Sequence, residues 1–495
     1  MNIVLTLLLI LASLLVYYIK YLLSYWKRRG IPHDEPSFPQ GNMVGFAKTK
    51  HITELLTPVY NKYKGNNRPF AGFYFLVKPS VLVLDLELVK NVLIKDFDKF
   101  DERGIFFNER DDPLSGNLFQ INGEKWRPLR HKISPTFTSG KMKFMFPTVT
   151  KIGDEFVNVF SEKVASTNSG VLEITDLLGR FTADVIGTCA FGLECNSLRN
   201  PNAEFVVMGR RAFVDRRHNR FVDTFLHSFP KLARNLRMAS IHPEIEAFYM
   251  RIVKETVEYR EKHNIKRQDF MDMLIEMKNS AENPITFEEL AAQAFVFFLA
   301  GFETSSTTMG FALYELAQAQ QVQDKMRAEI NQVLKKHNNE FSYECMQELK
   351  YVEKVIAETL RKHPVLSQLV RSAKADYTTS EPNYVIEKGT NVIIPVYAIH
   401  HDADIYPEPN KFDPERFSEE EQQKRPHCSY LPFGEGPRNC VGLRFGKMQT
   451  CIGLTYLIRN FRFSVCEQTK IPFDLVKSNF LLSPQNGIYL KVEKI

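Results

Sequence analysis

The chain has 495 residues, 44% of them hydrophobic, and a formal net charge of +6 at pH 7. That charge is too mild for a protein whose main partner is nucleic acid, because such proteins carry a dense basic surface. The seven cysteines are scattered, odd in number and without a Cys-x-x-Cys pair, which argues against a zinc site and against a disulfide framework.

The N-terminus is predicted to be an uncleaved membrane anchor. Residues 3–19 are almost wholly apolar, and residues 21–26 extend the run to the length that crosses a bilayer. The basic run Lys27-Arg28-Arg29 follows, so the positive-inside rule places the rest of the chain in the cytosol. Neither the charge order nor the cleavage site of a signal peptide is present. Aromatic residues near the end of the segment predict an interfacial belt of Tyr17, Tyr18, Tyr21, Tyr25 and Trp26.

Three parts follow from this pattern: the anchor at residues 1–26, a basic hinge rich in proline and glycine at residues 27–45, and one folded domain at residues 46–495. Apolar runs on both sides of a Lys-Pro-Ser turn predict a β-hairpin over residues 70–85. Residues 101–124 have the features of a long ordered loop, and such loops are often functional.

Two later segments carry polar groups in suggestive patterns. Trp126 and Arg130 are four residues apart, so on a helix they share one face and can bind a carboxylate together; alternatively they form a surface cation–π contact. Residues 208–240 interleave arginines with apolar residues. They form either a pair of solvated helices or a surface that contacts lipid headgroups.

A long buried helix is predicted after residue 285. The capping box Thr286-Phe-Glu-Glu289 starts a stretch without proline that runs past Glu315 and is apolar on nearly all sides. Within it lies Gly301-Phe-Glu-Thr304, whose polar groups are costly to bury. Thr304 either donates back to a carbonyl one turn earlier or takes part in chemistry.

Two elements are predicted between this helix and the last motif. The spacing of Glu358 and Arg361 predicts an ion pair on one helix face. Residues 384–386 and 391–394, around Lys388-Gly389, predict a hairpin.

The segment Phe433–Gly442 combines three glycines, one arginine and Cys440. Gly434 and Gly436 allow the backbone to turn tightly and to lie flat against a bulky planar partner. Cys440 precedes a helical pattern, whose unpaired N–H groups favour thiolate over thiol. Cys440 is therefore a candidate metal ligand, against the alternative of a small buried hydrophobic residue.

This segment is similar to the haem-binding loop of the cytochromes P-450, whose pattern is Phe-x-x-Gly-x-Arg-x-Cys-x-Gly. Phe433, Gly436, Arg438, Cys440 and Gly442 match it at every fixed position. The resemblance covers the whole chain and implies a mainly α fold with small β-sheets. That fold is a triangular helical prism around haem, here preceded by one N-terminal transmembrane helix.

The resemblance implies how haem b would be held. Cys440 would be its thiolate ligand, in a loop that includes Phe433 and Arg438. The haem propionates would be bound by Trp126, Arg130 and Arg371.

The resemblance also implies what the other motifs do. Gly301 would leave room above the haem, while Glu303 and Thr304 would pass protons during the cleavage of dioxygen. A buried triad that braces the haem region would consist of Glu358, Arg361 and Arg416.

By resemblance, the chain is a membrane-anchored haem-thiolate monooxygenase that inserts one atom of O2 into lipophilic small molecules. Electrons would come from NADPH through a flavoprotein reductase, with cytochrome b5 as a candidate second partner. The single-pass protein would lie in the endoplasmic reticulum membrane with its catalytic domain facing the cytosol. A basic group that attracts the reductase would consist of Arg127, Arg130, Lys132, Lys141 and Lys143.

Substrate class rests on a narrower likeness. The segment Ser134–Lys141 resembles the insect microsomal branch, which oxidises xenobiotics such as plant toxins and insecticides; oxidation of an endogenous lipid or hormone is the other interpretation. Two alternative functions stay open. A haem-thiolate isomerase or dehydratase needs no reductase, and the intact Glu303-Thr304 pair argues against it. A non-catalytic haem-binding protein needs Cys440 but neither Thr304 nor a reductase surface.

Overall fold

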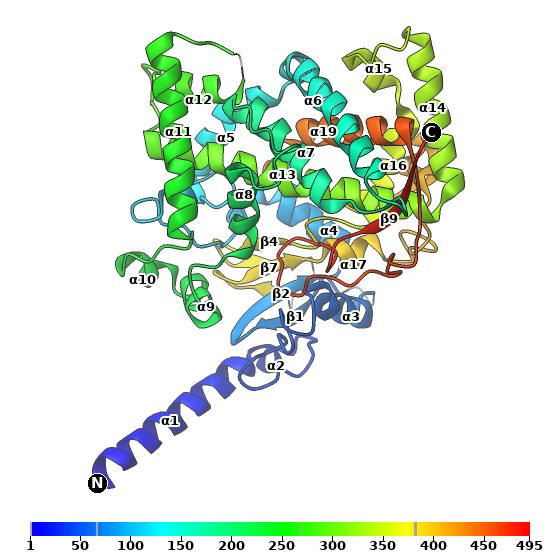
Figure 1. Ribbon diagram of the computed structural model, residues 1–495. Helices are drawn as coiled ribbons and strands as arrows, with labels where there is room; N and C mark the ends of the chain where they lie inside the picture. The colour runs from blue at the N-terminus through cyan, green and yellow to red at the C-terminus, as the bar shows by residue number, and fades with distance from the viewer. Residues whose placement is uncertain (1, 66–67, 268, 381–383) are drawn as a thin grey trace.

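The structure is organised around one long buried helix, α13 (Phe287–Gln318). The predicted capping box starts it: the Glu289 amide donates to Thr286 Oγ1 over 3.1 Å, and the Thr286 amide donates to Glu289 Oε2 over 2.9 Å. The helix then runs without proline through the middle of the molecule (Figure 1). Because apolar side chains cover most of its circumference, it can be buried on all sides, as the sequence predicts.

The computed structural model describes residues 2–65, 68–267, 269–380 and 384–495. The other helices are α1 (Asn2–Leu23), α2 (Tyr25–Arg28), α3 (Thr53–Tyr63), α4 (Leu86–Lys90), α5 (Gly123–Ile133), α6 (Ser139–Ala165), α7 (Thr175–Ile186), α8 (Glu204–Val214), α9 (Arg220–Ser228), α10 (Pro230–Asn235), α11 (Pro243–His263), α12 (Phe270–Lys278), α14 (Gln320–Lys336), α15 (Tyr343–Glu348), α16 (Lys350–Lys362), α17 (Val396–His400), α18 (Glu419–Lys424) and α19 (Leu443–Asn460).

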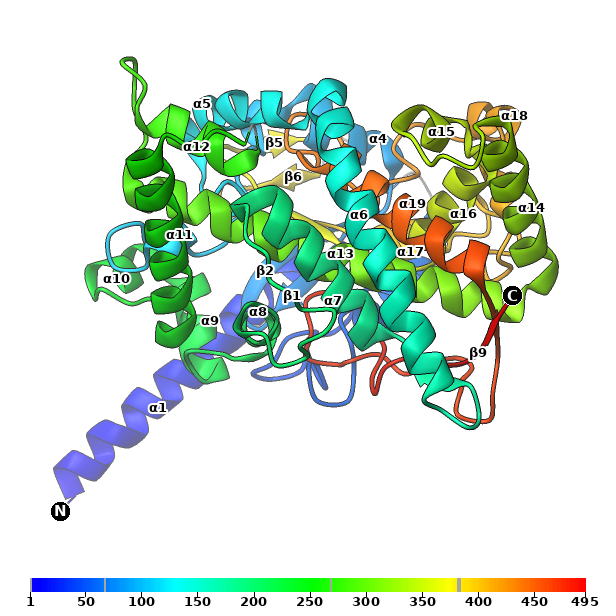
Figure 2. The same ribbon diagram turned by 45° about the horizontal axis from the view of Figure 1, so that its top comes forward.

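The larger apolar core surrounds α13. The helices α7, α11, α16 and α19 pack against it, and Phe298, Phe302 and Met309 of α13 belong to the same buried cluster as Phe181 and Leu454. In Figure 1 these helices lie above the first sheet, whereas Figure 2 shows strands β1 and β2 behind α7. The predicted class, mainly α with small sheets, is confirmed.

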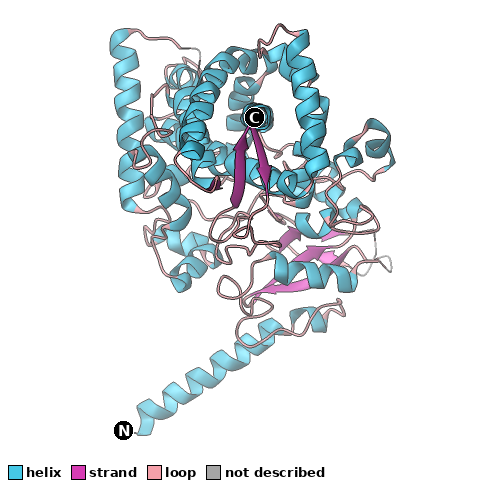
Figure 3. Ribbon diagram, turned by 45° about the vertical axis from the view of Figure 1, so that its right-hand side comes forward, coloured by secondary structure: helices cyan, strands magenta, loops and turns pink. Residues whose placement is uncertain are grey.

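Three small sheets complete the fold (Figure 3). The first has the order β1-β2-β7-β4, with β1 and β2 antiparallel, β2 and β7 parallel, and β7 and β4 antiparallel. The second pairs β5 with β6, and the third has the order β3-β9-β8. The strands are β1 (Phe70–Phe75), β2 (Lys78–Val83), β3 (Val171–Glu173), β4 (Leu369–Ser372), β5 (Tyr377–Thr378), β6 (Val385–Ile386), β7 (Asn391–Ile394), β8 (Phe461–Ser464) and β9 (Tyr489–Lys494).

One predicted hairpin is confirmed and the other is wrong. Strands β1 and β2 form the hairpin expected at residues 70–85. Strands β6 and β7 do not pair with each other, because β6 pairs with β5, and β7 lies between β2 and β4. The Gly389 amide donates to Ala373 O over 2.7 Å, which draws the connection toward the end of β4. An alternating pattern predicts a strand but not its partner.

At the N-terminus, α1 is, among the described residues, the one helix long and apolar enough to cross a membrane. Beyond it, Trp26 is fully buried: its indole Nε1 donates to Phe73 O over 3.1 Å, and a Cβ on Gly72 would lie 2.4 Å from its ring. The prediction that Trp26 belongs to an interfacial belt is therefore wrong. It fills a socket on β1, whereas Tyr17, Tyr18 and Tyr21 are exposed.

Replacing Trp26 by alanine is expected to lower the free energy of unfolding of the folded domain by about 3 kcal/mol, because a fully buried aromatic side chain is lost and a cavity remains. Denaturant unfolding of the full-length protein in detergent measures this as a lower midpoint. Tyr17→Ala is the matched control, since 70% of Tyr17 is exposed. Equal midpoints for the two variants would contradict a structural role for the indole.

Candidate functional site

The loop before α19 holds Cys440 in a defined turn. The Cys440 amide donates to Phe433 O over 2.8 Å, and the Asn439 amide donates to Gly436 O over 3.0 Å. Gly436 has a φ of 71°, and a Cβ there would lie 1.9 Å from Leu93 O. Only glycine satisfies both conditions, so the loop can lie against the segment that carries Leu93.

The Cys440 side chain is accessible to solvent, yet its thiol is desolvated. Enough protein surrounds it that this desolvation raises the pKa of the thiol. The Gly442 amide, Arg130 and Arg103 oppose this rise because each favours the thiolate. The Gly442 amide at the start of α19 therefore lowers the pKa of Cys440, as predicted from sequence, but desolvation raises this pKa by more.

Four arginines surround Cys440 without a carboxylate partner. In the part of the chain that the structure describes, none of Arg103, Arg130, Arg371 and Arg438 forms an ion pair within 4.0 Å. Arg371 and Arg438 are each only 2% exposed. Desolvation lowers the pKa of Arg371 to about 10 and, with help from Arg371, the pKa of Arg438 to about 9. Arg371 Nε and both Arg438 Nε and Nη1 are buried without a hydrogen-bond acceptor. Such donors call for a bound anion.

The two remaining arginines hold the loop itself. Arg130 donates from Nη1 to Asn439 O and from Nη2 to Asn439 Oδ1, both over 2.8 Å. Arg103 donates to Phe119 O over 2.8 Å and to Arg438 O over 3.2 Å. Sequence reasoning missed Arg103, because one arginine in a charged loop carries no signal until the loop is folded.

Trp126 and Phe433 border the same group. The guanidinium carbon of Arg438 lies 4.4 Å from the centre of the buried Trp126 ring, and Arg438 Nη2 donates to Ile121 O over 2.7 Å. Phe433 is partly buried against the larger core. The residues predicted for cofactor binding on α5, β4 and the cysteine loop therefore lie close together. Two donors of Arg130, however, bind Asn439 of the protein and are not available to a ligand.

Helix α13 brings the predicted polar residues close to α19, the helix that follows Cys440. Gln449 of α19 donates to Gly301 O over 3.0 Å. Thr304 Oγ1 donates to Ala300 O over 2.5 Å, which is the back-bond left open from sequence. Desolvation raises the pKa of Glu303, against the opposing charge of Arg210.

Gly301 lies against a neighbouring helix. A Cβ at this position would lie 2.2 Å from Ile186 Cδ1 of α7. That Gly301 also leaves room over a cofactor stays a prediction. The glycine is needed because α7 and α13 approach each other closely.

The predicted charged triad is present behind the loop. Arg361 binds Glu358 through two hydrogen bonds of 2.7 and 2.9 Å, and both side chains are fully buried. Arg416 Nε lies 3.5 Å from Glu358 Oε1. Arg361 also donates to His400 O and Pro409 O. One carboxylate thus joins α16 to the chain that leads into the cysteine loop.

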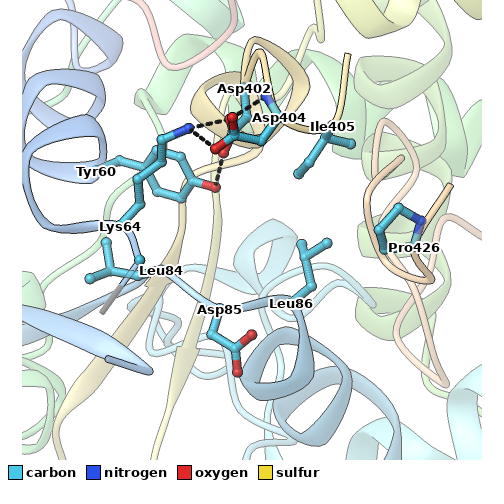
Figure 4. Close-up of a pocket in the computed structure, with 10 residues that line it drawn as sticks. Tyr60, Lys64, Leu84, Asp85, Leu86, Asp402, Asp404, Ile405 and Pro426 are labelled. Carbon is cyan, nitrogen blue, oxygen red and sulfur yellow. Dashed lines mark hydrogen bonds and ion pairs between the residues drawn. The ribbon is translucent and has the colours of Figure 1, made fainter. Parts of the chain in front are cut away.

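A separate surface pocket lies away from this centre (Figure 4). In it, Tyr60 donates to Asp402 over 3.0 Å, and Lys64 binds both Asp402 and Asp404. Its polar groups satisfy one another, whereas those around Cys440 do not. The candidate functional site is therefore the region around Cys440, where buried arginine donors have no acceptor.

Comparison with known proteins gives consistent matches. Residues 32–492 match the family model described as Cytochrome P450. The chain is 56% identical to "Probable cytochrome P450 6a23" of Drosophila melanogaster over the whole of both chains. It is 54% identical to cytochrome P450 6a8 of the same species, over 98% of this chain and 97% of the relative, and 49% identical to cytochrome P450 6a2 over the whole of both chains.

Replacing Glu358 by glutamine is expected to destabilise the protein by about 3 kcal/mol, because Arg361 and Arg416 then stay buried without a counter-charge. Glu353→Gln on the same helix is the control: Glu353 forms an exposed ion pair with Lys447, whose loss should cost less than about 1 kcal/mol. Thermal unfolding of both variants measures the difference. Similar melting temperatures would contradict the bracing role of Glu358.

Proposed function

The chain belongs to the cytochrome P450 family and is a haem monooxygenase of that family, and from this premise we propose the rest of its function. It inserts one atom of O2 into lipophilic small molecules while anchored in the endoplasmic reticulum membrane. Electrons reach it from NADPH through a flavoprotein reductase. The observation that carries the site assignment is the set of buried arginine donors without acceptors beside Cys440.

The residues around Cys440 fit haem b. Cys440 would be the thiolate ligand, and the orphaned donors of Arg371 and Arg438 match the carboxylates of the two propionates. We add Arg103 to the predicted partners, because its pKa is lowered by burial and by these same two arginines. Trp126 contributes its ring to Arg438. When bound, haem supplies the iron at which dioxygen is reduced and cleaved.

Glu303 and Thr304 would manage protons on the other face of the site. Burial raises the pKa of the Glu303 carboxyl, which favours the protonated form and so allows it to give a proton. The Thr304 hydroxyl donates to Ala300 O, which leaves its oxygen free to accept a hydrogen bond from water or oxygen species. This pair favours a monooxygenase over an isomerase or dehydratase, which needs no such proton delivery.

Several basic residues of the proposed reductase surface are already engaged within the protein. Arg130 points inward, while the exposed Arg127 and Lys143 pair with Asp98 and Glu344. Exposed ion pairs contribute little, so an acidic reductase surface can replace these partners at small cost. Cytochrome b5 would use the same basic group.

Membrane contact extends beyond α1 in this proposal. Helices α9 and α10, with the residue between them, expose large apolar side chains: Phe221 is 88% exposed, and Phe229 and Leu232 are about half exposed. Figures 1 and 2 show these helices at the end of the body from which α1 projects. Such a surface supports the lipid-contact interpretation of residues 208–240.

The function is tested by NADPH consumption with added reductase and a panel of lipophilic compounds, including plant toxins, insecticides and hormones. Oxygenated product supports the proposal. Rearranged or dehydrated product without NADPH use would favour an isomerase or dehydratase, and bound haem without turnover would favour a haem-binding protein.

Replacing Cys440 by serine is expected to abolish the red-shifted Soret band of the reduced carbon monoxide complex, because that band requires a thiolate ligand. Absorption spectra of the purified variant check this without turnover. Cys466→Ser is the control, since Cys466 lies in a partly exposed loop position. Persistence of the band in Cys440→Ser would identify another ligand.

Replacing Thr304 by alanine is expected to retain haem but to reduce product formation of the order of 10²-fold, with NADPH consumption diverted to hydrogen peroxide. Thr308→Ala is the matched control, because Thr308 makes the same kind of back-bond one turn further along, to Thr304 O over 2.7 Å. If both variants convert NADPH to product as efficiently as the parent, Thr304 has no part in proton delivery.

A further inference from the structure

A side chain of α19 reaches the turn of α13 that carries Glu303 and Thr304. Gln449 is fully buried, and its Nε2 atom donates to Gly301 O over 3.0 Å. Because a carbonyl can only accept, the amide nitrogen of Gln449 must face Gly301, and Oε1 must point away. Oε1 is buried without a donor among the described residues. An apolar side chain would fill the same space without this cost, so packing alone does not explain a glutamine here.

The carbonyls of this turn carry more hydrogen bonds than those of an ordinary helix. Each carbonyl from residue 300 to residue 304 accepts a hydrogen bond from a side chain. Thr304, Ser306 and Thr308 of α13 itself supply the donors for residues 300, 302, 303 and 304. The donor to Gly301 O comes from another helix. Side-chain donors draw carbonyls out of the helical ladder and bend a helix, so α19 helps to shape this turn.

The two helices approach closely on both sides of Gln449. Residues 446, 449 and 453 are three and four apart, so they share one face of α19. A Cβ on Gly446 would lie 3.9 Å from Ser305 Oγ, and a Cβ on Gly453 would lie 2.4 Å from Met309 Sδ. The lack of a side chain at both glycines therefore lets the Gln449 amide reach the backbone of α13.

This contact joins the two halves of the candidate site. Helix α19 begins at Leu443, three residues after Cys440. On α13, Glu303 and Thr304 follow Gly301 within one helical turn. The hydrogen bond of Gln449 thus runs from the helix behind the cysteine loop to the backbone from which the two proton-handling side chains project.

We propose that Gln449 is a positioning residue for proton delivery: it holds the Gly301 carbonyl and thereby fixes the backbone geometry of Glu303 and Thr304. It acts through these residues and does not touch the reacting atoms. This inference rests on the proposed function, because it concerns the proton delivery assigned there to Glu303 and Thr304. When the turn is not held, more of the oxygen that takes up two electrons and two protons leaves as hydrogen peroxide, and less is divided between product and water.

The first test replaces Gln449 by methionine, which keeps the length and burial of the side chain but removes the donor. The full-length haem-loaded protein is assayed with reductase and the compound of the panel that gives the most product. Product per NADPH is expected to fall about tenfold, as the loss of one hydrogen bond allows, while the Soret band of the reduced carbon monoxide complex stays unchanged. Gln318→Met is the control: Gln318 is exposed and donates to Tyr314 O over 3.0 Å near the end of α13.

The second test replaces Gln449 by glutamate and measures product per NADPH against pH. A protonated carboxyl can donate to Gly301 O as the amide does, whereas an ionised one cannot. Burial favours the protonated form, so the pKa of the introduced carboxyl lies above its usual range. Product per NADPH is therefore expected to match the parent at low pH and to fall as the pH rises through this pKa. One preparation is compared with itself, so a lower yield of folded variant does not affect the result.

Amide hydrogen exchange gives a readout that needs no turnover. Gln449→Met is expected to speed exchange about tenfold in residues 300–305, with residues 310–318 unchanged, because one local tether is lost. Unchanged exchange in residues 300–305, unchanged product per NADPH in Gln449→Met, or the absence of the pH step in Gln449→Glu would each overturn the role of Gln449. If Thr304→Ala still diverts oxygen to peroxide, the proposed proton delivery stands without Gln449. Lack of product from the parent protein with every compound would reject the proposed function and this inference with it.

Discussion

The unbalanced positive charge around Cys440 is the constraint on which the site depends. Arginines from four separate parts of the chain meet there, and two of them keep buried donors without acceptors. Leaving such groups unpaired costs more than a chain of this size can readily spare. A bound anionic group would supply the missing acceptors, so the haem proposed for this site would stabilise the fold as well as serve the chemistry.

The same chain neutralises buried arginines elsewhere. Glu358 compensates Arg361 and Arg416 behind the loop, and Asp269 and Asp272 compensate Arg260 between α11 and α12. Beside Cys440, no described carboxylate lies within 4.0 Å of Arg371 or Arg438, and their buried donors stay without acceptors. The contrast locates the site more sharply than the surface pocket of Figure 4 does, since there Lys64 already pairs with Asp402 and Asp404.

Features that depend on local spacing could be predicted from the sequence. The capping box at Thr286, the length of α13, the first hairpin and the pair of Glu358 with Arg361 all rest on contacts between near neighbours. Features set by distant partners could not. The role of Arg103 depends on its hydrogen bond to Arg438 O, and the need for glycine at 301 depends on Ile186 of α7. The burial of Trp26 depends on Gly72, which has no side chain. The partner of β7 likewise depends on two strands remote in sequence.

The Trp26 socket also sets a mechanical relation between anchor and body. Leu23, at the end of α1, and Trp26 belong to the same apolar cluster as Phe70 and Val81 of the first sheet. The connection between α1 and the sheet is therefore packed rather than flexible. Any change in the tilt of α1 therefore also changes the orientation of the first sheet. If α1 crosses a bilayer as proposed, its hydrophobic length then sets how the sheet is placed relative to the lipid, because mismatch with the bilayer is relieved by tilting.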